Sequence, residues 1–276
     1  MRKNDEIDNL ISVIEDFWQK KQNGECFNKN EAISIANNVI DLLDRGEISV
    51  VEKDVNGSWK INQWIKKAIL LSFQGQNKEI KSFDGAIWFD KCENKFKSWK
   101  ENDFQNANIR AVSGCFVRKG AFFSKGCVIM PSFVNIGAYV GANTMIDSMA
   151  TIGSCCYVGN NCHISANVCI GGVLEPLQAN PVIIEDNCFI GSGSQITEGV
   201  IVGEGSVVAS GVFVSASVKI IDRETGEVFL GKIPPYSVVV GGSYQTKNNL
   251  SINCAIITKK ITPEVRNKTS INDLLR

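Results

Sequence analysis

The sequence has no apolar run of the roughly 18 residues that a membrane-spanning helix requires. It begins MRKNDEIDNL, with charges where a secretory signal would be apolar, so we predict a cytoplasmic protein that does not enter a membrane. The formal net charge is zero, from 29 basic and 29 acidic residues, and basic residues form only short pairs such as Lys66-Lys67. Nucleic acid is therefore not an expected partner.

Metal-binding and redox motifs are also missing. The single histidine, His163, excludes zinc sites built from three histidines. The ten cysteines form no CxxC pair, and a chain of 276 residues does not need disulfides to stabilise its core. We predict reduced thiols in tight positions. No P-loop or dinucleotide-binding glycine motif is present, and Gly191-Ser-Gly-Ser is interpreted as a bend.

What the sequence does contain is a repeat of six residues. Stepping by six from Phe116 meets an apolar residue each time as far as Ile170, and the spacing resumes from Ile184 to Ile220. All 17 positions are apolar, and 15 are Val or Ile. They are Phe116, Phe122, Val128, Val134, Val140, Ile146, Ile152, Val158, Ile164, Ile170, Ile184, Ile190, Ile196, Val202, Val208, Val214 and Ile220. Such a sustained period predicts a coiled repeat architecture.

Each hexad can form one short strand and a bend, so that three hexads complete one triangular coil of a parallel β-helix. The marked side chains point inward, where stiff β-branched residues stack well. The position four residues later must also fit inside, and it is often small: Gly120, Gly126, Ser132, Ala138, Thr144, Ala150, Cys156, Cys162, Cys188, Ser194 and Ser206. Glycine often follows the marked residue, as at Gly141 and Gly153, where we expect the corner to bend. A β-sandwich would instead show period-two alternation, which is absent.

The flanking regions differ from the coil, which we place at 110–221. Residues 1–109 are predicted to form a mainly helical domain, with helices around 7–14, 32–43 and 63–73, a strand at 48–52 and a turn at 55–58. Asn30 is a candidate N-cap and Gly46 a candidate C-cap of the second helix. Residues 222–276 are predicted to cap the coil with strands at 228–233, 236–240 and 252–258 and a helix at 263–275.

Three features of the coil are candidates for chemistry. Asp147 follows Ile146 at a corner where most equivalent residues are Gly, Ser or Ala, so it could bind an amine or accept a proton, or be a solvated charge. His163 lies outside the coil and could act as a general base or have a structural or interface role. The insertion 171–183 interrupts the solenoid, and loops on rigid scaffolds often carry function. We expect it to contribute to a ligand site or to a subunit contact.

At these residues the chain resembles the 2,3,4,5-tetrahydropyridine-2,6-dicarboxylate N-succinyltransferases, a family of hexapeptide-repeat acyltransferases. The resemblance is carried by 146–154, 170–181 and 184–191, and extends to Asp222-Arg-Glu-Thr-Gly-Glu and Gln63-Trp-Ile-Lys-Lys-Ala. It implies a left-handed β-helix and a homotrimer with active sites between subunits. The implied reaction transfers succinyl from succinyl-CoA to a cyclic dicarboxylate in diaminopimelate and lysine biosynthesis, with no metal and no tightly bound cofactor.

The resemblance also implies roles for individual residues. Arg110 and Asp147 would bind the dicarboxylate substrate, because a guanidinium grips a carboxylate bidentately and an acid can hold or deprotonate the amine. Ser154 would add a polar contact to the substrate. The coenzyme A contacts would come from the loop and the later coils, at Gly172, Leu174, Ser210 and Lys232.

One segment departs from the family pattern. Where the family usually has Gly-Ala-Arg-Ser-Glu, this chain reads Gly191-Ser-Gly-Ser-Gln195. The family glutamate at this position is implicated in catalysis with the acid at Asp147, and glutamine cannot act as a base near neutral pH. Either Asp147 suffices, or Glu198 substitutes, or the enzyme is slow or has a different acyl donor or acceptor. A non-catalytic binding trimer is a further alternative.

Overall fold

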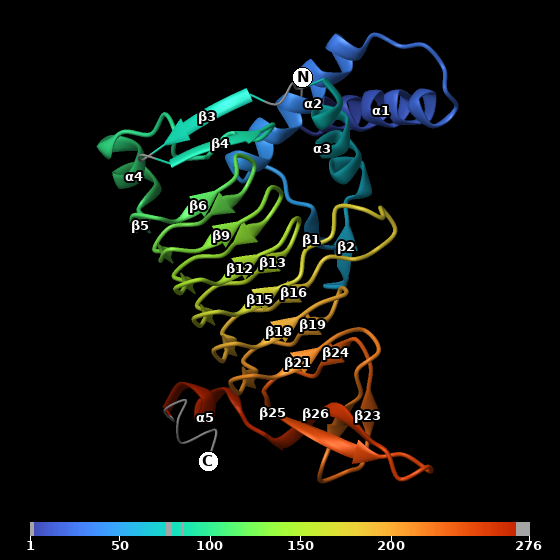
Figure 1. The fold of residues 1–276 in the computed structure, drawn as a ribbon, viewed down its shortest axis with the longest axis vertical. Helices are drawn as coiled ribbons and strands as arrows, with labels where there is room; N and C mark the ends of the chain where they lie inside the picture. The colour runs from blue at the N-terminus through green and yellow to red at the C-terminus, as the bar shows by residue number, and fades with distance from the viewer. Residues whose placement is uncertain (1–2, 76–78, 84–85, 269–276) are drawn as a thin grey trace.

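The structure is a computed structural model that describes residues 3–75, 79–83 and 86–268. Helices lie at one end, a coil of very short parallel strands forms the middle, and antiparallel strands close the other end (Figure 1). Over these described ranges, no helix has the length and apolar character needed to cross a membrane. The fold is mainly β: a parallel β-helix, as predicted from the hexads, lies between a helical part and a smaller cap. Its left-handed sense is the one that the family resemblance implies.

The coil has three faces, each a ladder of parallel strands from successive coils. Face 1 contains β5 (Arg110–Ala111), β8 (Val128–Ile129), β11 (Met145–Ile146), β14 (His163–Ile164), β17 (Phe189–Ile190) and β20 (Val207–Val208). Face 2 contains β6 (Phe116–Val117), β9 (Phe133–Val134), β12 (Thr151–Ile152), β15 (Cys169–Ile170), β18 (Gln195–Ile196) and β21 (Phe213–Val214). Face 3 contains β7 (Phe122–Phe123), β10 (Tyr139–Val140), β13 (Tyr157–Val158), β16 (Ile183–Ile184), β19 (Ile201–Val202) and β24 (Lys232–Ile233).

The predicted inward positions are correct from Val134 onward and wrong by one residue before it. Val117, Phe123 and Ile129 are the buried residues of the first coil, while the predicted Phe116, Phe122 and Val128 lie on the outside. The step from Ile129 to Val134 is one residue short of a hexad, so β6 pairs with β9 through Val117 and Val134. The outward rings are still used, because Phe116 stacks on Phe133 at 5.9 Å between centroids.

Because of the same one-residue shift, the small inward positions predicted at the start of the coil are also wrong by one residue. Gly120 and Gly126 lie at corners with φ of +89° and +81°, and Ala121 and Cys127 take the inward places. The predicted bend at the later corner glycines has a different cause. A Cβ on Gly141 would lie 2.5 Å from the carbonyl carbon of Gly159 in the next coil, so close approach between coils requires glycine there.

The cysteines inside the coil act as small hydrogen-bond donors, and all ten cysteines of the chain are free thiols as predicted. Cys156 donates from Sγ to the carbonyl of Gly171 at 3.2 Å, and Cys188 donates to that of Gly203 at 3.3 Å. The hydroxyl of Thr144 has the same place and donates to Gly159 at 2.8 Å. Burial raises the pKa of the Cys127 thiol to about 11 and that of Cys155 to about 12, so these thiols stay neutral.

The helical part contains α1 (Lys3–Gln22), α2 (Lys29–Asp44) and α3 (Gln63–Gly75). The N-cap of α2 is Asn28, whose side chain accepts from the backbone N–H of Glu31, and not the predicted Asn30, which lies inside the first turn. Gly46 follows α2 with φ of +69°, as predicted for a C-terminal cap. The predicted strand at 48–52 starts later, as β1 (Val51–Lys53), and forms a hairpin with β2 (Trp59–Ile61).

Both ends of the coil are covered. Along the chain, β3 (Glu79–Phe83), β4 (Ala86–Asp90) and α4 (Glu101–Ala107) follow α3 and precede the coil, and the ring of Phe96 joins the coil core near Trp99 and Phe104. At the other end are β22 (Ile220–Asp222), β23 (Val228–Phe229), β25 (Ser237–Gln245), β26 (Ser251–Lys260) and α5 (Pro263–Lys268). The predicted strand 228–233 is two strands, β23 and β24, and the predicted helix beyond residue 268 lies outside the described residues. The domain boundaries at 109 and 221 stay a prediction.

Candidate active site

Most of the candidate residues lie on two edges that border face 2. The acid edge, where the chain passes from face 1 to face 2, consists of 147–149, 165–167, 191–193 and 209–211. Backbone hydrogen bonds such as Asn167 N–H to Ser148 O, at 2.9 Å, join its successive corners. The loop edge, where face 2 passes to face 3, consists of 153–155, 171–182, 197–199 and 215–217. Because face 2 separates the two edges, each is described in turn.

Asp147 forms the start of the acid edge, directly after β11. Its Oδ1 accepts a hydrogen bond from the backbone N–H of Ser148 at 2.7 Å, which fixes the carboxylate at the corner. The structure brings His163 beside it, because β14 pairs with β11 so that His163 is in register with Met145. The distance from His163 Nε2 to Asp147 Oδ2 is 3.6 Å, an ion-pair distance that is too long for a hydrogen bond.

The imidazole of His163 is held rather than free to rotate. The ring of Phe189 on the next strand meets it edge-on at 5.4 Å. Its Nε2 is shielded from solvent and has no hydrogen-bond partner among the described residues. A buried donor or acceptor in this state is costly unless another molecule or a shift of Asp147 satisfies it. His163 therefore belongs with Asp147 in the candidate site, a pairing that sequence reasoning did not identify.

Backbone strain marks the same corner. In most coils the third residue after the marked position has positive φ, and it is usually Asn or Gly, as at Asn143, Asn161 and Asn187. Met149 and Cys155 are the exceptions in residue type. Met149 takes this conformation with φ of 58° and is 67% exposed. Left-handed conformations of bulky residues are costly and collect at functional sites. The replacement of Asn or Gly by Met149 in the repeat was a signal in the sequence that could have been used.

The remaining candidates near the acid edge lie further along the coil. Ser210 is exposed on this edge beside Gly211, whose N–H donates to Ser192 O at 2.9 Å. Gln195 is the first residue of β18 and is exposed on face 2. It pairs with Cys169, which pairs with Thr151 of β12, so two strand spacings, about 10 Å, separate it from the coil of Asp147. A single chain therefore does not bring Asp147 and Gln195 together.

The loop edge joins two predicted residues, Ser154 and Gly172. The N–H of Val173 donates to Ser154 O at 3.1 Å. A Cβ on Gly172 would lie 1.9 Å from the backbone nitrogen of Ser154, so only glycine fits at the root of the loop. Leu174 packs against the helical core instead of pointing into open space. Glu198 also lies on this edge, where its Oε2 accepts from Ala216 N–H, so it does not approach Asp147 within one chain.

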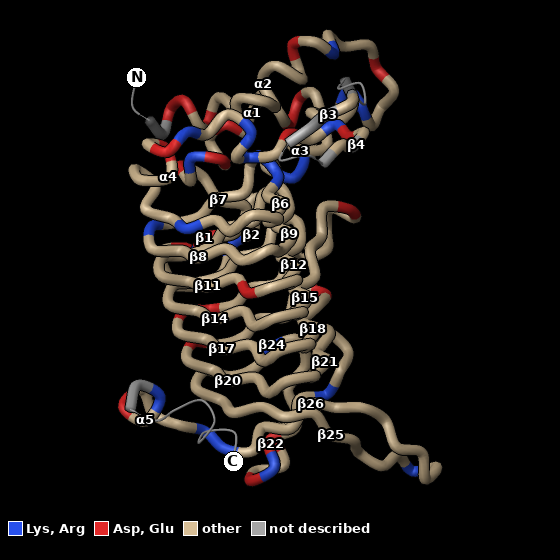
Figure 2. The backbone as a smooth tube through the Cα atoms, turned by 60° about the vertical axis from the view of Figure 1, so that its left-hand side comes forward, with Lys and Arg blue, Asp and Glu red and all other residues tan. Residues whose placement is uncertain are grey.

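The cationic candidates lie at the two ends of the coil. Arg110 is exposed at the start of face 1, two strands from β11, and Lys232 is exposed at the start of β24 on face 3. Between residues 126 and 218 the sequence has no Lys or Arg, while it has six acids: Asp147, Glu175, Glu185, Asp186, Glu198 and Glu204. Lys and Arg accordingly colour the helices and the cap in Figure 2 and leave the middle coils bare. An anionic ligand on the middle coils must therefore be met by backbone N–H groups, by these end residues, or by another chain.

The coil and its repeat define a class first, the hexapeptide-repeat acyltransferases. Residues 137–172 match the model for the bacterial transferase hexapeptide, and 181–216 match the hexapeptide repeat of succinyl-transferase. Residues 9–74 match the N-terminal region of tetrahydrodipicolinate N-succinyltransferase. The helical part, and not the coil, thus carries the most specific of the three matches.

Full-length relatives identify the family. The 2,3,4,5-tetrahydropyridine-2,6-dicarboxylate N-succinyltransferase of Wolbachia pipientis wMel is 54% identical, over 96% of this chain and 97% of that protein. The enzyme of the same name from Bartonella henselae is 47% identical, over 98% of this chain and 99% of that protein. The chain therefore belongs to the 2,3,4,5-tetrahydropyridine-2,6-dicarboxylate N-succinyltransferase family, as its resemblance predicted. The structure of a putative 2,3,4,5-tetrahydropyridine-2-carboxylate N-succinyltransferase from Campylobacter jejuni has the same fold, with a TM-score of 0.51 and 17% identity over 82% of this chain and 62% of that one.

Proposed function

We propose that this chain transfers the succinyl group of succinyl-CoA to tetrahydrodipicolinate, in the diaminopimelate branch of lysine biosynthesis. The acceptor is the amine of the hydrated, ring-opened dicarboxylate, and the products are N-succinyl-2-amino-6-oxopimelate and coenzyme A. The observation that carries the proposal is the 54% identity to a relative of that name over 96% of the chain. The family-specific match at 9–74 supports it independently of the repeats.

The proposed chemistry is direct acyl transfer at the acid edge. The amine nitrogen attacks the thioester carbonyl, a C–N bond forms, the C–S bond breaks, and the sulfur of coenzyme A leaves with the electron pair and takes up a proton. Asp147 accepts the proton that the amine loses, while the Ser148 N–H keeps its carboxylate in place. Gln195 contributes hydrogen bonds only, because its carboxamide is not a base at neutral pH.

The proposed assembly is a homotrimer in which the acid edge of one subunit faces the loop edge of its neighbour. Two observations support it: face 2 separates Asp147 from Ser154 and Gly172 within one chain, and the middle coils have no cation for anionic substrates. In this arrangement Arg110, Asp147 and Ser154 bind the dicarboxylate. Residues Gly172, Leu174, Ser210 and Lys232 contact succinyl-CoA, a co-substrate and not a resident cofactor. We propose the cytoplasm as the location of the reaction.

The test is an assay of coenzyme A release by the purified full chain, followed by chromatography so that protein thiols do not contribute. Release is expected when succinyl-CoA and tetrahydrodipicolinate are both present and not when either is omitted. Acetyl-CoA in place of succinyl-CoA tests for a changed donor, which Gln195 makes a specific alternative. Binding of both substrates by folded protein without any release would contradict the proposal and would favour a non-catalytic binding trimer.

A further inference from the structure

Lys66 is fully buried, with 0% of its surface exposed, although its side chain ends in an amine. It lies in α3, and its Nζ donates to the carbonyl oxygens of Leu177 at 2.7 Å and Ala179 at 2.9 Å. Both acceptors belong to the 171–183 loop, more than a hundred residues further along the chain. No ion pair found within the described residues includes Lys66, and burial lowers its pKa. Since burying such a group is costly, these two carbonyls are the contacts that stabilise it.

The loop depends on the helical part for more than these hydrogen bonds. Leu174 and Leu177 pack against the apolar cluster of α1, α2 and α3, which includes Ile65 and Ile69 next to Lys66. Within the loop, the N–H of Ala179 donates to Pro176 O at 3.1 Å, which turns the chain so that the carbonyls of 177 and 179 both reach the amine. The side chains of Leu174 and Leu177 thus attach the loop by hydrophobic contacts, while Lys66 binds the backbone at 177 and 179.

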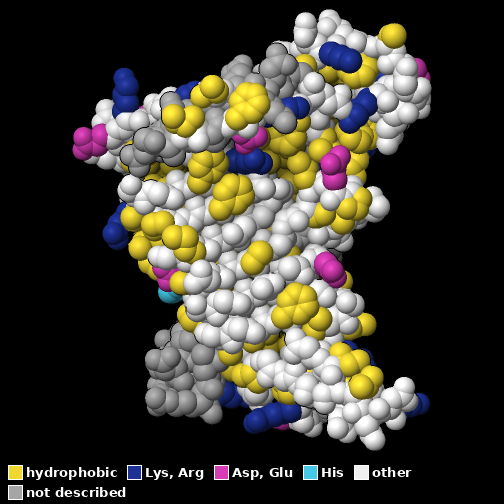
Figure 3. All heavy atoms as spheres, in the orientation of Figure 1, with side chains coloured by type: hydrophobic (Ala, Val, Ile, Leu, Met, Phe, Trp, Pro, Cys, Tyr) yellow, Lys and Arg dark blue, Asp and Glu magenta, His cyan; other side chains and the backbone are white. Residues whose placement is uncertain are grey.

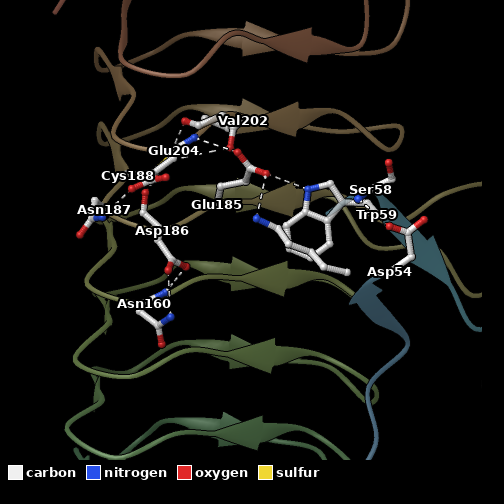
Figure 4. Close-up of polar contacts among 12 residues, drawn as sticks. Asp54, Ser58, Trp59, Asn160, Glu185, Asp186, Asn187, Cys188, Val202 and Glu204 are labelled. Carbon is white, nitrogen blue, oxygen red and sulfur yellow. Dashed lines mark hydrogen bonds and ion pairs between the residues drawn. The ribbon is translucent and has the colours of Figure 1, made fainter. Parts of the chain in front are cut away.

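The helical part is itself anchored on the coil next to the loop. Trp59 of β2 donates from Nε1 to Glu185 Oε1 at 2.8 Å (Figure 4). Its ring centroid lies 4.9 Å from that of Tyr157 on face 3. Glu185 directly follows β16, the first strand after the loop. Hydrophobic side chains also gather where the helices meet the coil (Figure 3). Lys66 thus extends from a helical part that is attached to the coil close to the point where the 171–183 loop returns to β16.

We propose that Lys66 is a positioning residue, which holds the 171–183 loop in the shape that accepts the acyl-CoA donor. The inference rests on the proposed function in one respect, that the loop flanks the coenzyme A arm. It gives the helical part, which carries the family-specific match, a role at the site: it shapes the loop edge. The acid edge, which the coil forms alone, does not depend on Lys66.

The test compares Lys66→Met with Lys67→Met. Lys67 is the adjacent residue of the same helix, but its Nζ pairs with Glu15 of α1, and no hydrogen bond found among the described residues joins its side chain to the loop. Hydrogen bonds from a charged donor contribute enough that Lys66→Met should raise the KM for succinyl-CoA roughly tenfold or more. The KM for the dicarboxylate and kcat should change less than about twofold. Lys66→Arg, which keeps a cationic N–H donor, should recover part of the loss.

Two further measurements separate positioning from stability. Replacing a buried amine by an apolar side chain should leave the Tm of Lys66→Met unchanged or raised, while hydrogen exchange at 174–180 becomes faster. Leu177→Ala should weaken coenzyme A binding through the same loop. The double variant should therefore lose less binding free energy than the sum of the losses in Leu177→Ala and Lys66→Met. If Lys66→Met fails to fold, Lys66→Arg and Leu177→Ala serve in its place.

Equilibrium binding of coenzyme A by calorimetry makes the inference independent of turnover. If the unaltered protein binds coenzyme A but releases none from succinyl-CoA, the proposed function fails while the role of Lys66 can still be measured. Unchanged coenzyme A affinity and unchanged loop exchange in Lys66→Met would overturn the inference, whatever the activity of the protein. A weaker affinity in Lys67→Met of the same size would overturn it as well.

Discussion

The acid edge and the loop edge border the same face of the coil but are stabilised in different ways. Asp147 is fixed by its neighbour Ser148 and lies next to His163 one coil away, so the hexad repeat alone forms that edge. The loop edge departs from the repeat and is held by Lys66 and by the apolar core of the helices. The proposed function accordingly places proton transfer on the rigid repeat, at Asp147, and the donor contacts of Gly172 and Leu174 on the inserted loop. Substitutions on the two edges should therefore affect different kinetic constants.

The largest effect is expected for Asp147→Asn on the acid edge. Asparagine keeps the acceptor for Ser148 N–H but cannot take the proton from the amine, so kcat should fall by about 10²–10⁴-fold with little change in the KM for succinyl-CoA. Steady-state kinetics measure both constants. Glu227→Gln, at an exposed acid of the cap, is the matched control and should behave as the unaltered protein. A fall in kcat/KM with kcat unchanged would place Asp147 in substrate binding only.

Gly172→Ala should give the next largest effect, on the loop edge. The added Cβ would meet Ser154 N at 1.9 Å and must displace the root of the loop. Misplacement by about 1 Å can cost about a hundredfold in kcat/KM, and here the loss should appear mainly in the KM for succinyl-CoA. Gly241→Ala, where a Cβ meets nothing within 4 Å, is the control. Full activity of Gly172→Ala would separate the loop root from the site.

Gln195→Glu tests the one departure from the family pattern. A restored carboxylate should raise kcat roughly tenfold or more if the missing base limits the rate. Glu198→Gln should instead lower kcat if Glu198 has taken over that role. No change in either variant would show that Asp147 suffices, and this result would sharpen the assignment of chemistry to the acid edge.

Smaller effects are expected inside the coil, where neither edge is touched. Cys156→Ala removes the donor to Gly171 O and should lower the free energy of unfolding by about 1 kcal/mol, whereas Cys156→Ser keeps a donor and should cost less. Chemical denaturation measures the difference, with exposed Cys26→Ala as the neutral control. An equal loss in the alanine and serine variants would show that volume, and not hydrogen bonding, selects cysteine there.

The last effect concerns pH and appears only above pH 9. The pKa of Cys127 is raised to about 11 from its usual 9 by burial, so the unfolded chain loses this proton first as pH rises. The stability that the neutral thiol contributes is present below pH 9 and is lost between pH 9 and about 11. Cys127→Ser, which does not ionise, should lose less stability over that range. A parallel decline in both proteins would contradict the assignment.

The hexads predicted the faces of the coil because an inward Val or Ile at fixed spacing is a local property of the chain. The one-residue register shift before Val134 was not predicted. One residue is missing near Pro131, and both candidates for the inward position, Val128 and Ile129, are apolar, so the pattern did not distinguish them. Asp147 was identified as an exception to the repeat, yet its pairing with His163 depends on which corners stack. Lys66 could not be assigned from the sequence, because its partners lie in the distant loop and are backbone carbonyls, which no residue type reveals.

The central claim is that each site needs the acid edge of one subunit and the loop edge of another, and subunit complementation tests it most directly. Asp147→Asn and Gly172→Ala proteins would be unfolded together, refolded as mixed oligomers and assayed for coenzyme A release. In random equal mixtures, half of the acid edges and half of the loop edges are intact, so about one quarter of the sites should regain full activity. Activity no greater than the mean of the two separate variants would contradict the claim and place both edges of a site in one chain.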